Sequence, residues 1–392
     1  MSDSRAAGVV VIGSGLAGYT LAREFRKLDR DTPVTIVTAD GGEVYSKPML
    51  SNAFAQNKTP RDLITKSANE AAGELGLSIL ARHRVLRIDG ASATIEAVSD
   101  AGATRMIAYD RLVLAIGADP RPYKVTGSDQ VPVAAVNDID AYAAWHGRLR
   151  RGDRVLLIGA GLIGSEFAND LLAGSFAVTI IDPMAWPLGR LVPEAVGLAL
   201  AAALRKAGAT IHLGRSVIRL QPAAGPGVIA ILDDGHEIHV DHALSAIGLV
   251  PRTALAQAAG LEIGQGILVD ALLQSSDPRI YALGDCAQTS IGTLPFVLPL
   301  MAQARALAAT LAGAPTPLKL PALPVGVKTP ALPIVVCPPA AGSQGEWKIE
   351  GDGRNLKALF QDVSGRAIGF ALAGTRTSER QSLVRDMPAL IA

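Results

Sequence analysis

Two copies of one glycine spacing, far apart in the chain, constrain the fold most. Residues 9–25 read VVVIGSGLAGYTLAREF and residues 155–170 read VLLIGAGLIGSEFAND, so an apolar stretch runs into G-x-G-x-x-G and then into a helical pattern. This order predicts a buried strand, a tight turn and a helix, the start of a dinucleotide-binding βαβ unit. Two such units predict two bound dinucleotides, although a duplicated unit with one silent copy would show the same spacing.

The three glycines of each copy have separate roles. In the first copy, Gly13 makes the tight turn, Gly15 lets the backbone approach a pyrophosphate, and Gly18 allows close packing of helix on strand. Backbone N–H groups and the positive end of the helix dipole then bind the phosphates. The second copy repeats these positions with Gly159, Gly161 and Gly164.

An acidic side chain at the end of the second strand of such a unit binds the adenosine ribose. In the first unit the strand 34–38 is followed by Ala39, so Asp40 comes slightly late, and either its carboxylate or backbone groups would serve the ribose. In the second unit Asp182 ends its strand, about 20 residues past the glycines. An acid there bonds a free 2′-hydroxyl and repels a 2′-phosphate, which favours NADH over NADPH.

Composition limits the class of protein. The 392 residues, 49% of them hydrophobic, suffice for two or three domains, and a net charge of +1 argues against a general nucleic-acid binder. The two cysteines, Cys286 and Cys337, are too few for a disulfide framework or a four-ligand zinc site, and they form no C-x-x-C redox pair. Without a signal segment or an apolar run long enough for a bilayer, the sequence predicts a reduced, cytoplasmic enzyme with no membrane partner.

Weaker patterns organise the rest of the chain. Residues 109–118, YDRLVLAIGA, and 243–248, ALSAIG, predict strands whose small-residue ends let the backbone pass close to a cofactor. Residues 53–80 are expected to be mostly helical. Prolines between 315 and 340 place a domain boundary near 315, and the tail from 347 predicts strands followed by a helix from about 378.

Together these segments resemble a known family. Two-dinucleotide flavoprotein reductases have segments similar to GSGLAG, YDRLVLAIGA, IGAGLIGSEFA, AIGLVPRTALAQAAGL and RIYALGD. The chain more closely resembles rubredoxin reductases, including those that reduce flavorubredoxin. The segments that show this resemblance are YSKPML, GLIGSEFAND, YALGDCA, FVLPLM and VKTPALPIVV. Single pieces are shared with ferredoxin and putidaredoxin reductases, but the resemblance covers nearly the whole chain. It implies an FAD enzyme that accepts a hydride from NADH and passes single electrons to rubredoxin.

The resemblance also implies the domain organisation. It implies an α/β fold with two Rossmann-like dinucleotide-binding domains, as in glutathione reductase, and a small α+β C-terminal domain. The FAD-binding domain is expected at 1–118 and 248–317, with the NAD(H)-binding domain at 119–247 inserted in it. Residues 318–392 are expected to form the C-terminal domain.

Several site residues follow from the resemblance by position. Lys47 and Glu166 are implied as a catalytic pair at the flavin, in which the cation favours the reduced ring and the carboxylate orients the cation. From the residues alone, Lys47 is better explained as a cation on a loop surface. Glu166 could be a surface carboxylate, but its place in the first turn after a phosphate-binding loop, facing the cleft between domains, argues against that. Further residues are implied around the FAD: Val85 at the adenine, Asp285 at the ribityl chain, and Val297 and Lys328 beside the isoalloxazine.

With the glycine turns and strand ends, these residues make up the expected cofactor site. The cofactor-binding residues expected for FAD and NADH are Gly13, Ser14, Gly15, Leu16, Ala17, Gly18, Ala39, Asp40, Lys47, Val85, Ala115, Gly117, Gly159, Gly161, Leu162, Ile163, Gly164, Glu166, Asp182, Gly248, Gly284, Asp285, Val297 and Lys328. No metal site is expected.

Cysteine usage separates the alternatives. Glutathione-reductase-like enzymes need a cysteine pair beside the flavin, and related oxidases use a cysteine near 45–47, where the chain has Tyr45-Ser46-Lys47. Cys286 is therefore expected to be a small buried residue. Besides rubredoxin reduction, two functions remain open: an NADH-dependent [2Fe–2S] ferredoxin reductase of an oxygenase system, and an FAD-bound redox sensor or scaffold. An acidic rubredoxin would need a basic docking face, and the enzyme is expected to be a monomer or a weak homodimer.

Overall fold

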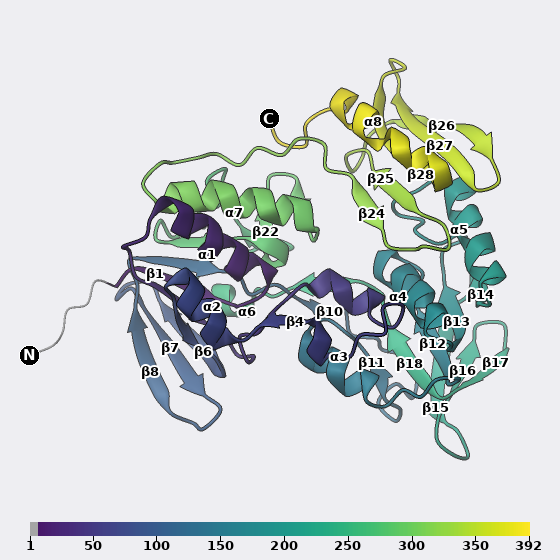
Figure 1. Cartoon of the computed structure of the whole chain (residues 1–392), viewed down its shortest axis with the longest axis horizontal. Coiled ribbons are helices and arrows are strands. Elements are labelled where there is room, and N and C mark those ends of the chain that lie inside the picture. The colour runs from purple at the N-terminus through teal and green to yellow at the C-terminus, as the bar shows by residue number, and fades with distance from the viewer. Residues whose placement is uncertain (1–6) are drawn as a thin grey trace, which may run out of the picture.

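The computed structural model describes residues 7–392, so the first six residues of the expected FAD-binding domain lie outside it. Two units built on parallel sheets are joined to a third built on an antiparallel sheet (Figure 1). Within the described residues, no helix has the length and apolar composition needed to cross a bilayer. This architecture confirms the predicted α/β class with two dinucleotide-binding folds and a smaller C-terminal unit.

The first unit is organised around a buried parallel sheet in the order β21-β9-β1-β2-β5. Its strands are β1 (Val9–Ile12), β2 (Val34–Val37), β5 (Ser78–Leu80), β9 (Arg111–Leu114) and β21 (Ile280–Ala282). All four residues of β1 are buried, as an apolar central strand of a two-sided sheet requires. Helices α1 (Leu16–Leu28) and α7 (Val297–Leu311) lie side by side over one face of this sheet (Figure 1).

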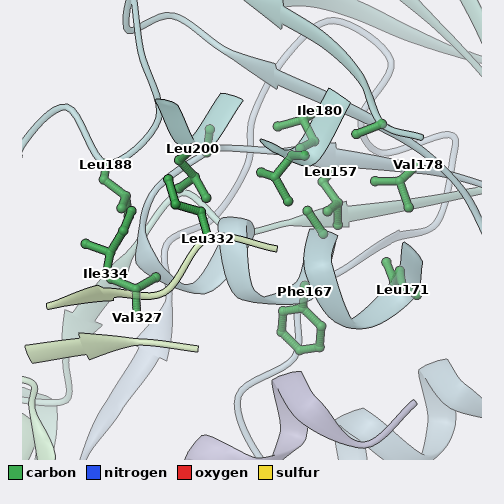
Figure 2. Close-up of a cluster of buried hydrophobic side chains, with 14 of the residues drawn as sticks. Leu157, Phe167, Leu171, Val178, Ile180, Leu188, Leu200, Val327, Leu332 and Ile334 are labelled. Atoms are coloured by element: carbon green, nitrogen blue, oxygen red, sulfur yellow. The ribbon is translucent and has the colours of Figure 1, made fainter. Parts of the chain in front are cut away.

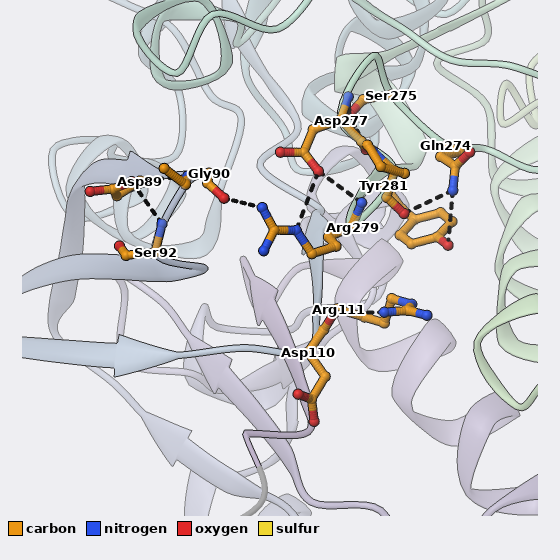
Figure 3. A network of polar contacts seen from close by, with 12 residues as sticks. Asp89, Gly90, Ser92, Asp110, Arg111, Gln274, Ser275, Asp277, Arg279 and Tyr281 are labelled. Atoms are coloured by element: carbon orange, nitrogen blue, oxygen red, sulfur yellow. Dashed lines mark hydrogen bonds and ion pairs between the residues drawn. The ribbon is translucent and has the colours of Figure 1, made fainter.

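The opposite face of this sheet is covered by a small antiparallel sheet of β6 (His83–Asp89), β7 (Thr94–Ser99) and β8 (Thr104–Ala108). Arg279, just before β21, ties the two sheets together (Figure 3). Its guanidinium donates to the carbonyl of Gly90 in the β6–β7 turn, while its backbone N–H donates to Asp277 over 2.8 Å. The late strand β21 is thereby fixed to an early hairpin.

The second unit repeats this architecture with the parallel order β11-β18-β12-β13-β14. Its strands are β11 (Val133–Ala134), β12 (Arg154–Ile158), β13 (Ala177–Asp182), β14 (Thr210–Leu213) and β18 (His242–Ser245), and its helices are α3 (Ile139–His146), α4 (Leu162–Ala173) and α5 (Glu194–Lys206). A three-stranded antiparallel sheet follows α5: β15 (Val217–Pro222), β16 (Val228–Leu232) and β17 (Glu237–Val240).

Two antiparallel strands, β10 (Ala118–Pro120) and β19 (Leu249–Pro251), carry the chain into and out of the second unit. The third unit follows later in the chain. It contains β24 (Val325–Val327), β25 (Ile334–Cys337), β26 (Gly345–Asp352), β27 (Asn355–Asp362), β28 (Ala367–Ala373) and the terminal helix α8 (Arg380–Asp386). These strands form one antiparallel sheet in the order β24-β25-β28-β27-β26.

The second and third units share a hydrophobic core (Figure 2). Phe167 and Leu171 of α4 lie in the same buried cluster as Val327 and Ile334 of the third unit. The cluster also contains Leu50, which belongs to the first half of the chain. Segments from all three parts of the sequence therefore meet around α4.

The remaining elements are short. They are β3 (Val44–Tyr45), η1 (Lys47–Asn52), η2 (Arg61–Leu63), β4 (Ile64–Lys66), α2 (Ala68–Leu75), α6 (Ala254–Ala258), β20 (Ile267–Leu268), η3 (Gly284–Cys286), β22 (Ala287–Thr289), β23 (Gly292–Thr293) and η4 (Gly374–Glu379), where η marks a 3₁₀-helix. The expectation of a mostly helical segment at 53–80 is wrong, since its one α-helix, α2, begins at a Ser67–Glu70 capping box and ends at Gly76. The residues before α2 are held by tertiary contacts instead.

Candidate functional site

The two glycine turns have the same steric construction. Gly13 and Gly159 have φ of +110° and +105°, and a Cβ on them would lie 2.4 Å and 2.8 Å from the carbonyl oxygens of Ala115 and Ala246. Both positions therefore require glycine, because of the positive φ and of the neighbouring strand end. The turns that the spacing predicts are present in both copies.

The other glycines divide into closed and open positions. A Cβ on Gly18 or Gly164 would lie 2.0 Å or 1.9 Å from the carbonyl oxygen of the first glycine of its motif, so each helix packs directly on its turn. A Cβ on Gly15 or Gly161 would meet nothing within 4 Å, and neither helix has a side-chain cap at that residue. Uncapped N–H groups beside open space fit a pyrophosphate, so both turns fit a bound dinucleotide.

Asp40 closes the first turn. Its Oδ1 accepts hydrogen bonds from the hydroxyls of Ser14 and Thr38, both at 2.7 Å, and from the backbone N–H of Gly42 at 2.9 Å. The carboxylate thus lies just past the end of β2, beside the glycine loop, with Thr38 and Ala39 between it and the strand. Its role at the ribose stays a prediction.

Asp182 occupies the corresponding place in the second turn. Its Oδ2 accepts from the backbone N–H of Ala160 at 2.5 Å, and its Oδ1 accepts from that of Met184 at 2.7 Å. The carboxylate is 8% exposed and braces the loop between the first two glycines. The structure therefore gives Asp182 a supporting contact that the sequence did not indicate, while ribose binding stays a prediction.

Strand ends with small residues lie next to these turns. Gly117 and Gly248 both have positive φ, and a Cβ on either would meet nothing within 4 Å. Arg252 N–H donates to the carbonyl of Gly117 over 3.0 Å, and Arg121 N–H donates to that of Gly248 over 2.9 Å. The two segments that connect the first and second units are therefore hydrogen-bonded to each other at Gly117 and Gly248, which are expected to pass close to the cofactors.

Lys47 pairs with Asp285 across the first unit. Lys47 Nζ lies 3.8 Å from Asp285 Oδ2, and their side chains are 36% and 19% exposed. Burial lowers the pKa of Lys47 and raises that of Asp285, and in each case the partner's charge opposes the effect of burial. The two groups thus stabilise each other's charged form in a partly desolvated place.

Glu166 pairs with Lys328. The carboxylate is 3% exposed, contacts the ammonium of Lys328, and accepts the backbone N–H of Lys328 at 3.0 Å. Ser51 joins them: its hydroxyl donates to Glu166 Oε2 over 2.8 Å and accepts from Lys328 Nζ over 2.9 Å. The buried carboxylate is therefore neutralised and hydrogen-bonded by two segments distant in the sequence.

These contacts correct the expected Lys47–Glu166 pair. Lys328 takes the place beside Glu166 because the third unit delivers both its ammonium and its backbone N–H there. Lys47 lies at the other end of η1 from Ser51 and turns toward Asp285. The roles of Lys47 and Glu166 at a flavin stay predictions, now with different partners.

Gln303 is a residue that the sequence did not reveal. It is fully buried on α7, and its Oε1 accepts the backbone N–H of Gly284, next to Asp285, over 2.7 Å. Among the described residues its Nε2 finds no acceptor. A buried donor without a partner beside a residue expected at the ribityl chain fits a site that a cofactor completes.

The remaining predicted residues surround these turns. Val85 is half-buried on β6, whose first residue, His83, donates its N–H to Thr38 at the end of β2. Val297 is 37% exposed at the start of α7, which has no side-chain cap. The first turns of α1 and α4 contain Leu16, Ala17, Leu162 and Ile163.

The cysteines are not reactive groups of this site. Cys286 is fully buried and Cys337 is 4% exposed, and burial raises the pKa of each thiol to about 11. The prediction that Cys286 is a small buried residue is confirmed. Within residues 7–392, no group of three or more His, Cys, Asp and Glu side chains is arranged to hold a metal ion.

Comparisons with known proteins agree with this arrangement. Residues 7–303 match the family described as pyridine nucleotide-disulphide oxidoreductase, and residues 317–387 match the rubredoxin binding C-terminal domain. A rubredoxin-NAD(+) reductase of Alcanivorax borkumensis is 40% identical over 98% of this chain and 99% of its own length. A nitric oxide reductase FlRd-NAD(+) reductase of Aeromonas salmonicida is 37% identical over 97% of this chain and 96% of its own.

A solved structure has the same fold. The crystal structure of a covalent putidaredoxin reductase–putidaredoxin complex has a TM-score of 0.86 at 25% identity, covering 97% of this chain and 93% of that one. The resemblance inferred from the motifs is thereby confirmed. The chain belongs to the pyridine nucleotide-disulphide oxidoreductases, within the group that carries a rubredoxin-binding C-terminal domain.

Proposed function

We propose that this protein is an NADH-dependent FAD enzyme that passes electrons to rubredoxin. The observation that carries the proposal is the duplicated glycine turn, with the same closed and open positions in both copies, in a chain that continues into the rubredoxin-binding domain. When bound, FAD connects a two-electron hydride donor to a one-electron carrier. In this proposal the chain's own residues bind and orient the two cofactors and hold charge beside them.

The two turns bind different cofactors in this proposal. The first turn, at 13–18, holds FAD, whose far end extends toward Gly284 and Asp285. The second turn, at 159–164, holds NADH, and Asp182 disfavours a 2′-phosphate there. In this proposal, residues 1–118 and 248–317 form the FAD-binding domain, and residues 119–247 form the NADH-binding domain. Residues 318–392 form the C-terminal domain.

Charge around the flavin comes from two lysines and a helix. Lys47, held by Asp285, and Lys328, held by Glu166 and Ser51, are proposed to stabilise the negative charge that reduction adds. The uncapped start of α7 at Val297 presents the positive end of a 15-residue helix to the same region. Passing both electrons of a hydride to two one-electron carriers would release its proton, which solvent can accept, so the arrangement requires no side chain as a general acid or base.

Rubredoxin is the proposed partner because the C-terminal unit matches the domain described as binding it. We propose a cytoplasmic location, consistent with two reduced, buried cysteines. The similarity to a putidaredoxin reductase complex favours one second candidate, a reductase for a [2Fe–2S] ferredoxin. The two candidates differ in which carrier is reduced quickly.

Stopped-flow spectroscopy of the FAD-loaded protein tests the proposal. We expect NADH to bleach the flavin absorbance, and rubredoxin to restore it much faster than a plant-type ferredoxin does. The matched control replaces NADH by NADPH, which should bleach more slowly because of Asp182. Preference for ferredoxin would move the assignment to the second candidate. Slow bleaching together with indifference to both carriers would contradict both candidates and favour a flavin-bound sensor.

A further inference from the structure

One face of α4 carries three buried polar side chains. Glu166, Asn169 and Asp170 are spaced i, i+3 and i+4, so they line one side of the helix, and each is at most 8% exposed. None of them bonds within the second unit's sheet. Each instead reaches a segment from another part of the chain, which makes this face a junction rather than a core surface.

Asp170 holds the segment that follows η1. Its Oδ2 accepts the backbone N–H groups of Ala53 and Phe54 at 3.1 and 3.2 Å, and its Oδ1 accepts that of Ala55 at 2.8 Å. Three successive donors converge on one carboxylate that is 1% exposed. An asparagine would offer a single acceptor oxygen and would turn its own N–H groups toward these donors. The position therefore requires a carboxylate.

The same segment is fixed at its other end and by packing. Tyr45, before η1, accepts the backbone N–H of Ile139 at the start of α3 over 3.2 Å. Phe54 packs its ring on His146 and Phe176, each with a centroid separation of 5.0 Å. Residues 45–55 precede the second unit in sequence, yet they are bound to its helices α3 and α4.

Residues 45–55 also carry the groups that face the proposed flavin site. Ser51, two residues before Ala53, bridges Glu166 and Lys328, and Lys47 begins the same 3₁₀-helix. On the other side, Asn169 accepts the backbone N–H of Ala331 at 2.9 Å and so fixes the loop after Lys328. Lys328 is thus positioned directly from α4, the helix whose first turn is the proposed NADH site, and Lys47 begins the 3₁₀-helix that leads into the segment bound by Asp170.

We propose that Asp170 is a positioning residue for this enzyme: by fixing residues 53–55 on α4, it holds Ser51 against Glu166 and Lys328. The inference rests on the proposed function. Burial raises the pKa of Asp170 to about 6, against the lowering effect of its three N–H donors and of the charge of Lys328. Asp170 lies nine residues after Gly161 on α4, about 14 Å along the helix, so nucleotide binding and lysine placement share one rigid element.

Asp170→Asn and Ser51→Ala, alone and combined, test the proposal by the rate of flavin reduction at saturating NADH. We expect Asp170→Asn to slow reduction about tenfold or more, because small misplacements at a reacting centre cost rate steeply, with little change in the NADH dependence. Ser51→Ala should slow it as well. Adding Asp170→Asn to Ser51→Ala should then have little further effect, since Asp170 acts through Ser51.

Amide hydrogen exchange supplies a readout that does not depend on activity. We expect residues 53–55 to lose protection in Asp170→Asn, in the protein with and without FAD. The matched control is Asp362→Asn in the β27–β28 turn, where the carboxylate accepts the backbone N–H groups of Ser364 and Arg366 over 2.9 and 3.0 Å. It makes the same chemical change away from α4 and should leave the reduction rate unchanged.

Several outcomes would overturn the inference. One is a rate within twofold of wild type in Asp170→Asn although residues 53–55 lose protection. Another is a double variant whose losses multiply, which would mean that Asp170 acts independently of Ser51. Should Asp170→Asn fail to fold, Asp170→Glu replaces it: its added methylene shifts the segment while keeping both acceptors, and an unchanged rate would refute the role. A wild-type protein that NADH does not bleach would instead refute the proposed function.

Discussion

Two alanine substitutions in the second glycine turn separate ligand binding from packing. Gly161 has φ of −69° and ψ of −167°, a conformation open to alanine, and a methyl group there would meet nothing within 4 Å. We expect Gly161→Ala to change the free energy of unfolding by no more than about 0.5 kcal/mol. The methyl group would, however, fill the space through which the backbone approaches a pyrophosphate. We expect this to weaken NADH binding by about 1.4 kcal/mol or more, which corresponds to a Kd for NADH that is tenfold higher or more.

Gly164→Ala should do the reverse. Its methyl group would lie 1.9 Å from the carbonyl oxygen of Gly159, so α4 has to move off its turn by about an ångström. Overpacking of this kind costs about 1–3 kcal/mol, and the gain in helix propensity, about 1 kcal/mol, offsets only part of it. We expect a lower melting temperature in this variant.

The assay titrates NADH against flavin bleaching in the stopped flow and follows thermal unfolding of the same samples. Gly15→Ala is the matched control in the first turn, where a methyl group is equally free of protein contacts. It should reduce FAD content while leaving the melting temperature of the apoprotein near that of wild type. Wild-type NADH affinity in Gly161→Ala would refute the assignment of the second turn, and wild-type stability of Gly164→Ala would refute the steric argument.

Three further predictions concern charged and thiol groups. Neither Cys286 nor Cys337 should react with a thiol reagent at pH 8 in the folded protein, because burial raises the pKa of both to about 11, and both should react once it is unfolded. Lys47→Met should lower the flavin potential and Asp285→Asn should raise it, by about 30 mV for each ~1.4 kcal/mol of charge stabilisation; shifts of the same sign would contradict the pairing. For Asp170, burial raises the pKa from 3.8 to about 6, so ionising this carboxyl group costs more in the folded than in the unfolded chain: the stability linked to its protonation is fully present below about pH 4 and is lost as the pH rises through 6, although its hydrogen bonds remain. The stability of wild type relative to Asp170→Asn should therefore fall by up to about 3 kcal/mol between pH 4 and 7 in denaturant titrations.

Patterns within short stretches of the sequence predicted the turns and helices whose structure depends on neighbouring residues. The two glycine turns and the helices after them follow from spacing and hydrophobic periodicity, and α1 and α4 begin at Leu16 and Leu162, directly after the second glycine of each motif. The steric roles of these glycines are equally local, because the closed positions face their own turn or the adjacent strand end.

Contacts between units could not be predicted in this way. Ser51 lies 115 residues from Glu166 in the sequence, and Lys328 lies 162 residues beyond it, so no periodicity links them. The expected Lys47–Glu166 pair failed for this reason: Lys328 was expected beside the flavin but not against Glu166, and the packing of the third unit on α4 brings it there. The one available signal was the set of polar residues 166, 169 and 170 on one side of a helix whose other residues, apart from Ser165, are apolar or glycine.

The nesting of one nucleotide-binding unit inside the other has a consequence for biosynthesis. β9 ends at 114 and its sheet neighbour β21 begins at 280, so the ribosome makes the whole inserted unit, through β18, before the outer sheet can close. Until then the edge of β9 lacks its partner strand, while the inserted unit already has all of its strands. Asp285 and α7 emerge later still. We therefore expect the nascent chain to become competent for NADH before it becomes competent for FAD, the reverse of the order in which the two glycine turns are translated.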